Sequence, residues 1–81
     1  MQGMQEARER LDQLIRKYLR VPKDHQLEDE DDVSSFAADW RIVDLGMMVE
    51  TEFGIPMSAD KALSLKTIGD WHALLSTAIG D

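Results

Sequence analysis

The sequence predicts a small all-α protein, a bundle of three main helices and one short helix. Apolar residues recur at three- and four-residue spacing in three segments, which is the period of an amphipathic helix. No segment alternates apolar and polar residues as a half-buried strand does. The chain has 81 residues, of which 43% are hydrophobic and 31% are charged. We therefore expect a single globular domain over residues 1–81, because two hydrophobic cores do not fit into this length.

The first helix is expected over residues 5–19. Its apolar residues form one stripe at helical spacing: Ala7, Leu11, Leu14, Ile15, Tyr18 and Leu19. Val21-Pro22 should end it, because a proline disfavours helical backbone angles in the residue that precedes it.

A long connection follows over residues 22–38 and contains five consecutive acids at 28–32. Like charges at this density oppose a helix and favour solvated side chains. We expect Leu27, Val33 and Phe36 to pin the connection to the core. Loops of this length in compact domains are often functional, so the connection is a place to look for a site.

The second helix is expected to start after Asp39, with the Asp39 carboxylate as its N-cap. It should run to about Phe53 and stop at Gly54, a residue suited to a left-handed C-cap, with Pro56 two positions on.

The remaining chain predicts one short helical turn over Ser58–Leu63 and a last helix. Thr67-Ile68-Gly69-Asp70 resembles a capping box that would open the last helix. We expect Gly80 to end that helix. Its core face is predicted to hold Ile68, Trp71, Leu74, Leu75 and Ala78.

The second helix carries more apolar residues than its core face needs. That core face is predicted to consist of Ile42, Leu45, Gly46, Val49 and Phe53. A further row lies on the other side and is called here the Trp40 strip: Trp40, Val43, Asp44 and Met47. Tryptophan and methionine suit protein docking, so we expect the strip to bind a partner. The alternative is that the long connection folds back over Trp40.

Charge is distributed unevenly along the chain, whose formal net charge is −7. Residues 1–20 hold five basic and three acidic side chains, whereas residues 24–60 hold eleven acids and one base, Arg41. Such a field repels phosphate backbones, which disfavours nucleic acid as a partner. It would instead steer a basic protein toward the chain, mainly by raising the association rate. The alternative is that the acidic surface only maintains solubility.

Several classes of function are disfavoured by composition and spacing. The chain has no cysteine, which excludes a disulfide framework, a thiolate zinc site and a cysteine nucleophile. His25 and His72 lie in different elements without metalloprotease spacing, and His72 is interpreted as a helix-surface residue. The acidic run lacks the glycine and spacing of a calcium loop. We therefore expect no metal site and, with no nucleophile–base pair visible, no enzyme.

The apolar runs are much shorter than the ~18–20 residues of a membrane span. The first ten residues lack the apolar segment of a signal peptide. The expectation is a cytoplasmic protein without a membrane span.

Three segments together carry a family resemblance. They are Glu9-Arg10-Leu11 through Leu19-Arg20-Val21, Val43-Asp44-Leu45 through Glu50-Thr51-Glu52-Phe53-Gly54-Ile55, and Thr67-Ile68-Gly69-Asp70. They are similar to the first helix, the second helix with its end, and the start of the fourth helix of acyl carrier proteins. The resemblance covers nearly the whole chain and implies an acyl-carrier-like bundle with a long loop between its first two main helices.

The resemblance also implies an attachment site, and here the sequence departs from the family. Acyl carrier proteins bear a serine at the start of the second helix, in an Asp-Ser-Leu motif, and its hydroxyl receives 4′-phosphopantetheine. Counting back from Phe53-Gly54-Ile55 without gaps puts Asp39 at the position of the serine and Trp40 at that of the leucine. Aspartate has no hydroxyl to modify, so no cofactor is expected at Asp39.

Ser34 and Ser35 are the nearby hydroxyls, and Ser35 lies four residues before Asp39. Ser35 could take phosphopantetheine only if the second helix began earlier, which Ala37-Ala38 would permit; the ordinary interpretation of Ser34 and of Ser35 is a solvated loop serine.

Three functions follow. We favour a monomeric, non-catalytic interaction module that docks through the Trp40 strip and the acidic connection into a basic groove on an enzyme of lipid or polyketide metabolism. The alternatives are a functioning acyl carrier modified at Ser35 or Ser34, and a small helical protein that self-associates through the strip.

Overall fold

The computed structural model describes residues 3–79 and confirms the all-α fold class. Over these residues it holds four α-helices, one short 3₁₀ helix and no strand. The elements are α1 (Gly3–Leu19), η1 (Val33–Ser35), α2 (Asp39–Phe53), α3 (Ala59–Ser64) and α4 (Ile68–Ile79). The three long helices and the short α3 match the predicted number and order, and η1 interrupts the long connection.

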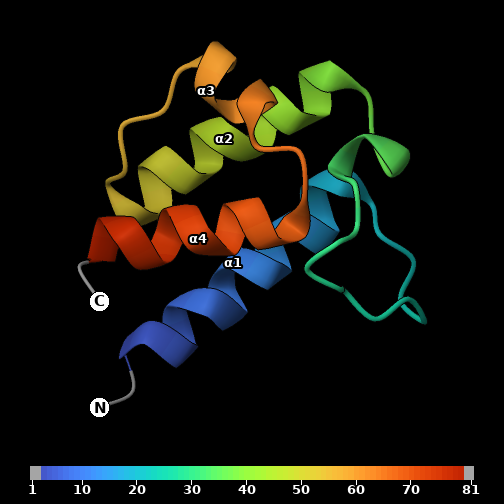
Figure 1. Cartoon of the computed structure of the whole chain (residues 1–81), viewed down its shortest axis with the longest axis horizontal. Helices are drawn as coiled ribbons and strands as arrows, with labels where there is room; N and C mark the ends of the chain where they lie inside the picture. Colours follow the sequence, from blue (N-terminus) through green and yellow to red (C-terminus); the bar gives the residue numbers. More distant parts are fainter. Residues whose placement is uncertain (1–2, 80–81) are drawn as a thin grey trace.

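The three long helices enclose the core, and α3 caps one side of it (Figure 1). Helix α1 packs against α2 and α4, and α2 also packs against α3. The side chains that are 1% exposed or less come from all three long helices and α3: Leu11, Ile15, Leu19, Leu45, Val49, Ala62, Ile68, Trp71 and Leu75. Helix α2 is also contacted by η1, and its outer side, which carries Trp40 and Met47, faces solvent.

Helix α1 begins at Gly3, two residues earlier than predicted, and ends at Leu19. Arg20 then takes a left-handed backbone conformation with φ +55°. The chain turns there, and the Val21 N–H donates to the Arg16 carbonyl at 3.2 Å. Val21, the second residue after α1, is buried in the core.

The long connection is an ordered part of the bundle. Leu27, Val33 and Phe36 pack against the core as predicted, and Val33 is only 2% exposed. The Val33 N–H donates to the Lys66 carbonyl at 2.9 Å, which joins the connection to the segment between α3 and α4. Two further backbone bonds run from the first turn of α4, from Ile68 N–H to the Asp31 carbonyl and from Gly69 N–H to the Asp29 carbonyl.

The start of α4 is the capping box that the sequence predicts. The Asp70 N–H donates to the Thr67 hydroxyl at 3.1 Å, and the Thr67 N–H donates to the Asp70 carboxylate at 3.2 Å. The same carboxylate accepts from the Lys66 N–H at 2.9 Å. This arrangement satisfies backbone donors that have no partner within the helix.

The core face of α4 is mostly as predicted. Ile68, Trp71 and Leu75 are buried and Leu74 is half-buried. The prediction is wrong for Ala78: it is exposed, as Thr77 before it is, so the buried stripe that includes Trp71 and Leu75 does not continue to Ala78. Gly80, the expected helix end, lies outside the described residues.

Helix α2 ends as predicted. Gly54 adopts φ +70°, and its N–H donates to the Glu50 carbonyl at 2.8 Å. Earlier in the helix, Gly46 allows α3 to approach closely, since a Cβ built there would lie 2.8 Å from the Ala62 Cβ and 3.0 Å from the Met57 Cγ.

Candidate interaction surface

Asp39 is the first residue of α2 and is not its N-cap. The N-cap is Ala38, whose backbone is extended and whose carbonyl accepts from the Arg41 and Ile42 N–H groups. No side chain caps this end, so the prediction of an Asp39 cap is wrong by one residue. The Asp39 carboxylate still lies in the first turn, where the helix dipole favours a negative charge.

The Trp40 strip runs along the solvent side of α2. The Trp40 side chain is 61% exposed and the Met47 side chain is 58% exposed, which are large fractions for apolar residues of this size. Val43 between them is half-buried and Asp44 is exposed. The alternative in which the long connection covers Trp40 is therefore wrong. The Arg41 guanidinium lies 4.6 Å from the centre of the Trp40 ring.

Ser34 and Ser35 lie in η1, ahead of α2. Both hydroxyls are exposed; Ser34 donates to the Asp32 carboxylate at 2.7 Å and Ser35 donates to the Asp32 carbonyl at 2.6 Å. Because Ala38 is extended, α2 does not reach back through Ala37-Ala38. The condition that would bring Ser35 into the register of a helix-start serine is not met.

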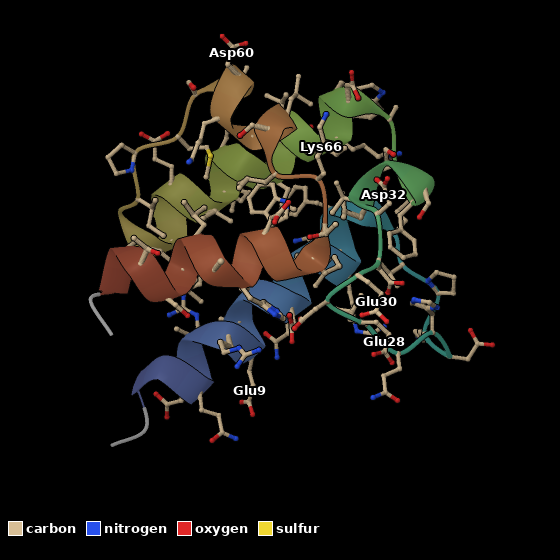
Figure 2. All side chains as sticks on the ribbon, viewed as in Figure 1. Glu9, Glu28, Glu30, Asp32, Asp60 and Lys66 are labelled. Atoms are coloured by element: carbon tan, nitrogen blue, oxygen red, sulfur yellow. The ribbon has the colours of Figure 1, made fainter. Side chains whose placement is uncertain are left out.

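A pocket of about 330 Å³ opens beside the start of α2. Its lining residues are Asp32, Val33, Ser34, Asp39, Ile42, Leu63 and Lys66. It brings Ser34 and Asp39 to the edge of one hollow, whereas Ser35 is not among the lining residues. Sequence reasoning missed Lys66, which comes from the segment before α4 and lies at the same end of the bundle as Asp32 (Figure 2).

Two carboxylates of the acidic connection are held as anions by local donors. The His25 imidazole at 2.8 Å, together with the Glu28 N–H at 2.9 Å, holds the pKa of the Asp31 carboxyl below its ordinary value. The Ser34 hydroxyl and N–H do the same to the pKa of the Asp32 carboxyl. Glu28 and Glu30 are exposed as predicted, but Asp31 is half-buried against His25.

His72 makes tertiary contacts with other parts of the chain, and its interpretation as a helix-surface histidine is wrong. Its side chain is 14% exposed, and its Nε2 lies 2.7 Å from the Asp12 carboxylate on α1. Its Nδ1 lies 3.3 Å from both the Asp29 carboxylate and the Arg8 guanidinium. Asp12 and Asp29 contact opposite nitrogens of the imidazole ring, so His72 links α4 to α1 and to the long connection. The two carboxylates do not point at a common position where they could chelate a metal ion. Within residues 3–79, no three His, Asp or Glu side chains form a group that could hold a metal ion.

None of the helices described over residues 3–79 combines the length and the apolar content that crossing a bilayer would take.

Comparison with known proteins gives one informative similarity. The chain is 30% identical to acyl carrier protein 3, chloroplastic, of Cuphea lanceolata, over 81 aligned residues. The alignment covers 99% of this chain and 57% of the plant protein, so the chain spans little more than half of that relative's length. No family model matches the chain, and no solved structure matches it. Taken with the four-helix fold, the similarity supports an acyl-carrier-like protein.

Proposed function

We propose that the chain is an acyl-carrier-like protein that works as a non-catalytic interaction module and not as a carrier loaded on the usual serine. The observation that carries the proposal is the Trp40 strip, where two large apolar side chains lie exposed beside an acid on the outer side of α2. The similarity to a protein named as a carrier, together with the lack of any nucleophile–base pair in the sequence, favours binding over catalysis.

The attachment position is assigned by sequence register. Gly54 ends α2, and counting back from Phe53-Gly54-Ile55 without gaps supports the proposal that Asp39 is the counterpart of the family serine. A carboxylate there gives the start of α2 the negative charge that the helix dipole favours. It offers no hydroxyl to a phosphopantetheinyl transferase, so no 4′-phosphopantetheine is expected at that residue.

The proposed partner is an enzyme of lipid or polyketide metabolism with a basic docking groove. Residues 24–60 carry eleven acids against one base, so opposite charge on the partner would speed association. Trp40 and Met47 would then anchor the complex by burying apolar surface, since exposed aromatic and methionine side chains are frequent hot spots of interfaces. The chain is expected to act as a cytoplasmic monomer.

The register is tested by incubation with a phosphopantetheinyl transferase and coenzyme A, followed by intact mass. The wild-type chain should gain no phosphopantetheine. The matched variant Asp39→Ser supplies the hydroxyl at the proposed position and should become loaded. Loading of the wild type would contradict the proposal. Failure to load Asp39→Ser would remove the support for the register.

Docking is tested with the same transferase as a basic-groove probe. The wild-type chain should compete with a genuine acyl carrier protein for loading, and the competition should weaken as salt is raised. Asp44→Lys should compete less well while keeping its helical circular dichroism. Met47→Ala should also compete less well and should cost less than about 0.5 kcal/mol of stability, because Met47 is mostly exposed. Unchanged competition by both variants would exclude the strip as the docking surface.

A second candidate function is an acyl carrier modified at a displaced serine. It is favoured by the pocket that Ser34 shares with Asp39, which would put an arm on Ser34 close to the family position. Ser34→Ala and Ser35→Ala variants distinguish the two hydroxyls if the wild type is loaded. The remaining alternative, self-association through Trp40, predicts a sedimentation coefficient that rises with concentration and falls back in Trp40→Ala.

A further inference from the structure

His72 lies where α4, α1 and the long connection meet, and three charged groups contact its ring. The Asp12 carboxylate on α1 lies 2.7 Å from Nε2. The Asp29 carboxylate of the connection and the Arg8 guanidinium of α1 each lie 3.3 Å from Nδ1. One ring nitrogen therefore has a single partner, whereas the other has two partners of opposite charge.

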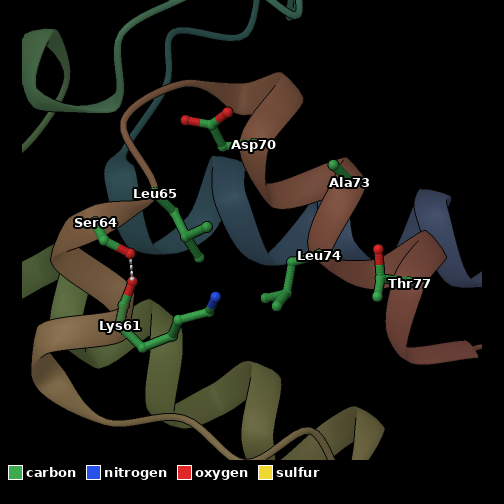
Figure 3. A pocket seen from close by; sticks show the side chains of 7 residues that line it. All are labelled: Lys61, Ser64, Leu65, Asp70, Ala73, Leu74 and Thr77. Carbon is green, nitrogen blue, oxygen red and sulfur yellow. Dashed lines mark hydrogen bonds between the residues drawn. The ribbon is translucent and has the colours of Figure 1, made fainter.

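The side of α4 that faces α3 adds no charged partner to this ring. There α4 borders a hollow of about 380 Å³, whose charged lining residues are Lys61 and Asp70 (Figure 3). His72 is not among the residues that line the hollow. Over the part of the chain that the structure describes, the ionisable groups that bond to the ring are therefore the three on α1 and the connection.

The two protonation states of the ring use different partners at Nδ1. Beside the Asp12 carboxylate, Nε2 carries a proton in both states, because a carboxylate only accepts hydrogen bonds. In the neutral ring Nδ1 is then an acceptor, which takes a hydrogen bond from Arg8 and has no proton to donate to Asp29. In the imidazolium Nδ1 carries a proton, so it donates to Asp29 and is repelled by Arg8. Protonation therefore exchanges a partner on α1 for a partner on the connection.

This exchange affects the connection because Asp29 also holds it to α4 through the backbone. The Asp29 carbonyl accepts the Gly69 N–H at 2.8 Å, and a Cβ built at Gly69 would lie 3.1 Å from that carbonyl oxygen. When the connection lifts from α4, the protonated ring loses its bond to Asp29, whereas the neutral ring keeps both of its bonds to α1. Lifting the connection therefore costs more free energy when the ring is protonated.

We propose that His72 is a proton-dependent switch, whose protonated ring holds the acidic connection against α4 through Asp29 and whose neutral ring does not. Histidine is the side chain whose charge ordinarily changes between about pH 5 and 8. The added bond is present at the lower end of that range and is lost as the pH rises. Because the Asp29 side chain is 73% exposed, solvent weakens the bond, and we expect the opening equilibrium to change by about three- to fivefold. The inference does not depend on the Trp40 strip or on the register of Asp39.

The test is amide hydrogen exchange of the full chain, expressed as protection factors so that the intrinsic pH dependence of exchange is removed. The amides of Ile68 and Gly69 report on the opening, because both donate to carbonyls of the connection. Their protection factors should be about three- to fivefold higher at about pH 5.5 than at about pH 8. The imidazole ¹⁵N shifts of His72 should show the Nε2–H form at the higher pH. Equal protection at the two pH values, or the Nδ1–H form, would overturn the proposal.

Three substitutions distinguish the switch from general effects of charge. Asp29→Ala should abolish the pH dependence of protection while the His72 ring still titrates, because the bonds of the ring to α1 remain. Glu30→Ala is the matched control, since it removes the same charge from the exposed neighbouring residue, and it should keep the pH dependence. His25→Gln should also keep it, although it removes the other histidine of the chain. A pH dependence that persists in Asp29→Ala, or that disappears in Glu30→Ala or His25→Gln, would contradict the assignment to His72 and Asp29.

Discussion

Replacing Gly46 with alanine should destabilise the protein although alanine is the better helix former. In an exposed helix this exchange would gain about 0.5–1 kcal/mol. At Gly46 the new Cβ would lie 2.8 Å from the Ala62 Cβ and 3.0 Å from the Met57 Cγ. The Met57 side chain can rotate away, but the Ala62 Cβ moves only with the backbone of α3.

The net effect follows from these two terms. Overpacking a core contact costs about 1–3 kcal/mol, which outweighs the gain in helix propensity. We therefore expect Gly46→Ala to lower the free energy of unfolding by about 1–2 kcal/mol, or the melting temperature by roughly 5–15 °C for a domain of this size.

The assay is urea denaturation followed by circular dichroism, with Thr51→Ala on the exposed side of α2 as the control. The control should change stability by no more than about 0.5 kcal/mol. Ala62→Gly removes the opposing methyl group, so in the double variant Gly46→Ala should no longer be harmful, with a coupling energy of about 1 kcal/mol or more. A Gly46→Ala variant as stable as the wild type would refute the close contact between α2 and α3.

Three further outcomes are expected. Asp70→Ala should cost about 1–2 kcal/mol in thermal melts, because it removes the acceptor of the capping box at α4; an unchanged melting temperature would contradict that role. His72→Ala should cost about 1–2 kcal/mol, because it breaks the charge-assisted contact between α4 and α1, and comparison with Asp12→Ala should show that the two losses do not add. Since the folded pKa of Asp31 lies below its ordinary value of 3.8, its stabilising effect is present above that pH and is lost as the pH falls through the lower folded value; Asp31→Asn should flatten the acid limb of a stability–pH curve.

Local patterns in the sequence were sufficient for most of the fold. The 3.6-residue period of apolar side chains located α1, α2 and α4. It did so because most of the apolar residues at this spacing are the ones that become buried when the helices pack together. Gly54 and the Thr67–Asp70 box marked helix ends through interactions within a few residues of each other. Such interactions involve residues close together in the sequence, so they can be predicted from the sequence alone.

The features that were missed depend on groups distant along the chain. His72 is covered because Asp12 and Asp29 approach it from α1 and from the connection, and no spacing within α4 encodes that meeting. Lys66 enters the pocket of Asp39 for the same reason. The predicted N-cap, Asp39, is off by one residue. Ala38 has the extended backbone of an N-cap, and no side chain forms a capping hydrogen bond there.

The backbone bonds between the acidic connection and α4 have a consequence for how the molecule opens. The N–H groups of Ile68 and Gly69 donate to the carbonyls of Asp31 and Asp29. The first turn of α4 is therefore hydrogen-bonded to a segment that is distant in the sequence. Hydrogen exchange at these two amides therefore requires the connection to lift, and their protection should report on that opening and not on fraying of α4. The most acidic stretch of the molecule and the first turn of its last helix should detach as a single cooperative unit.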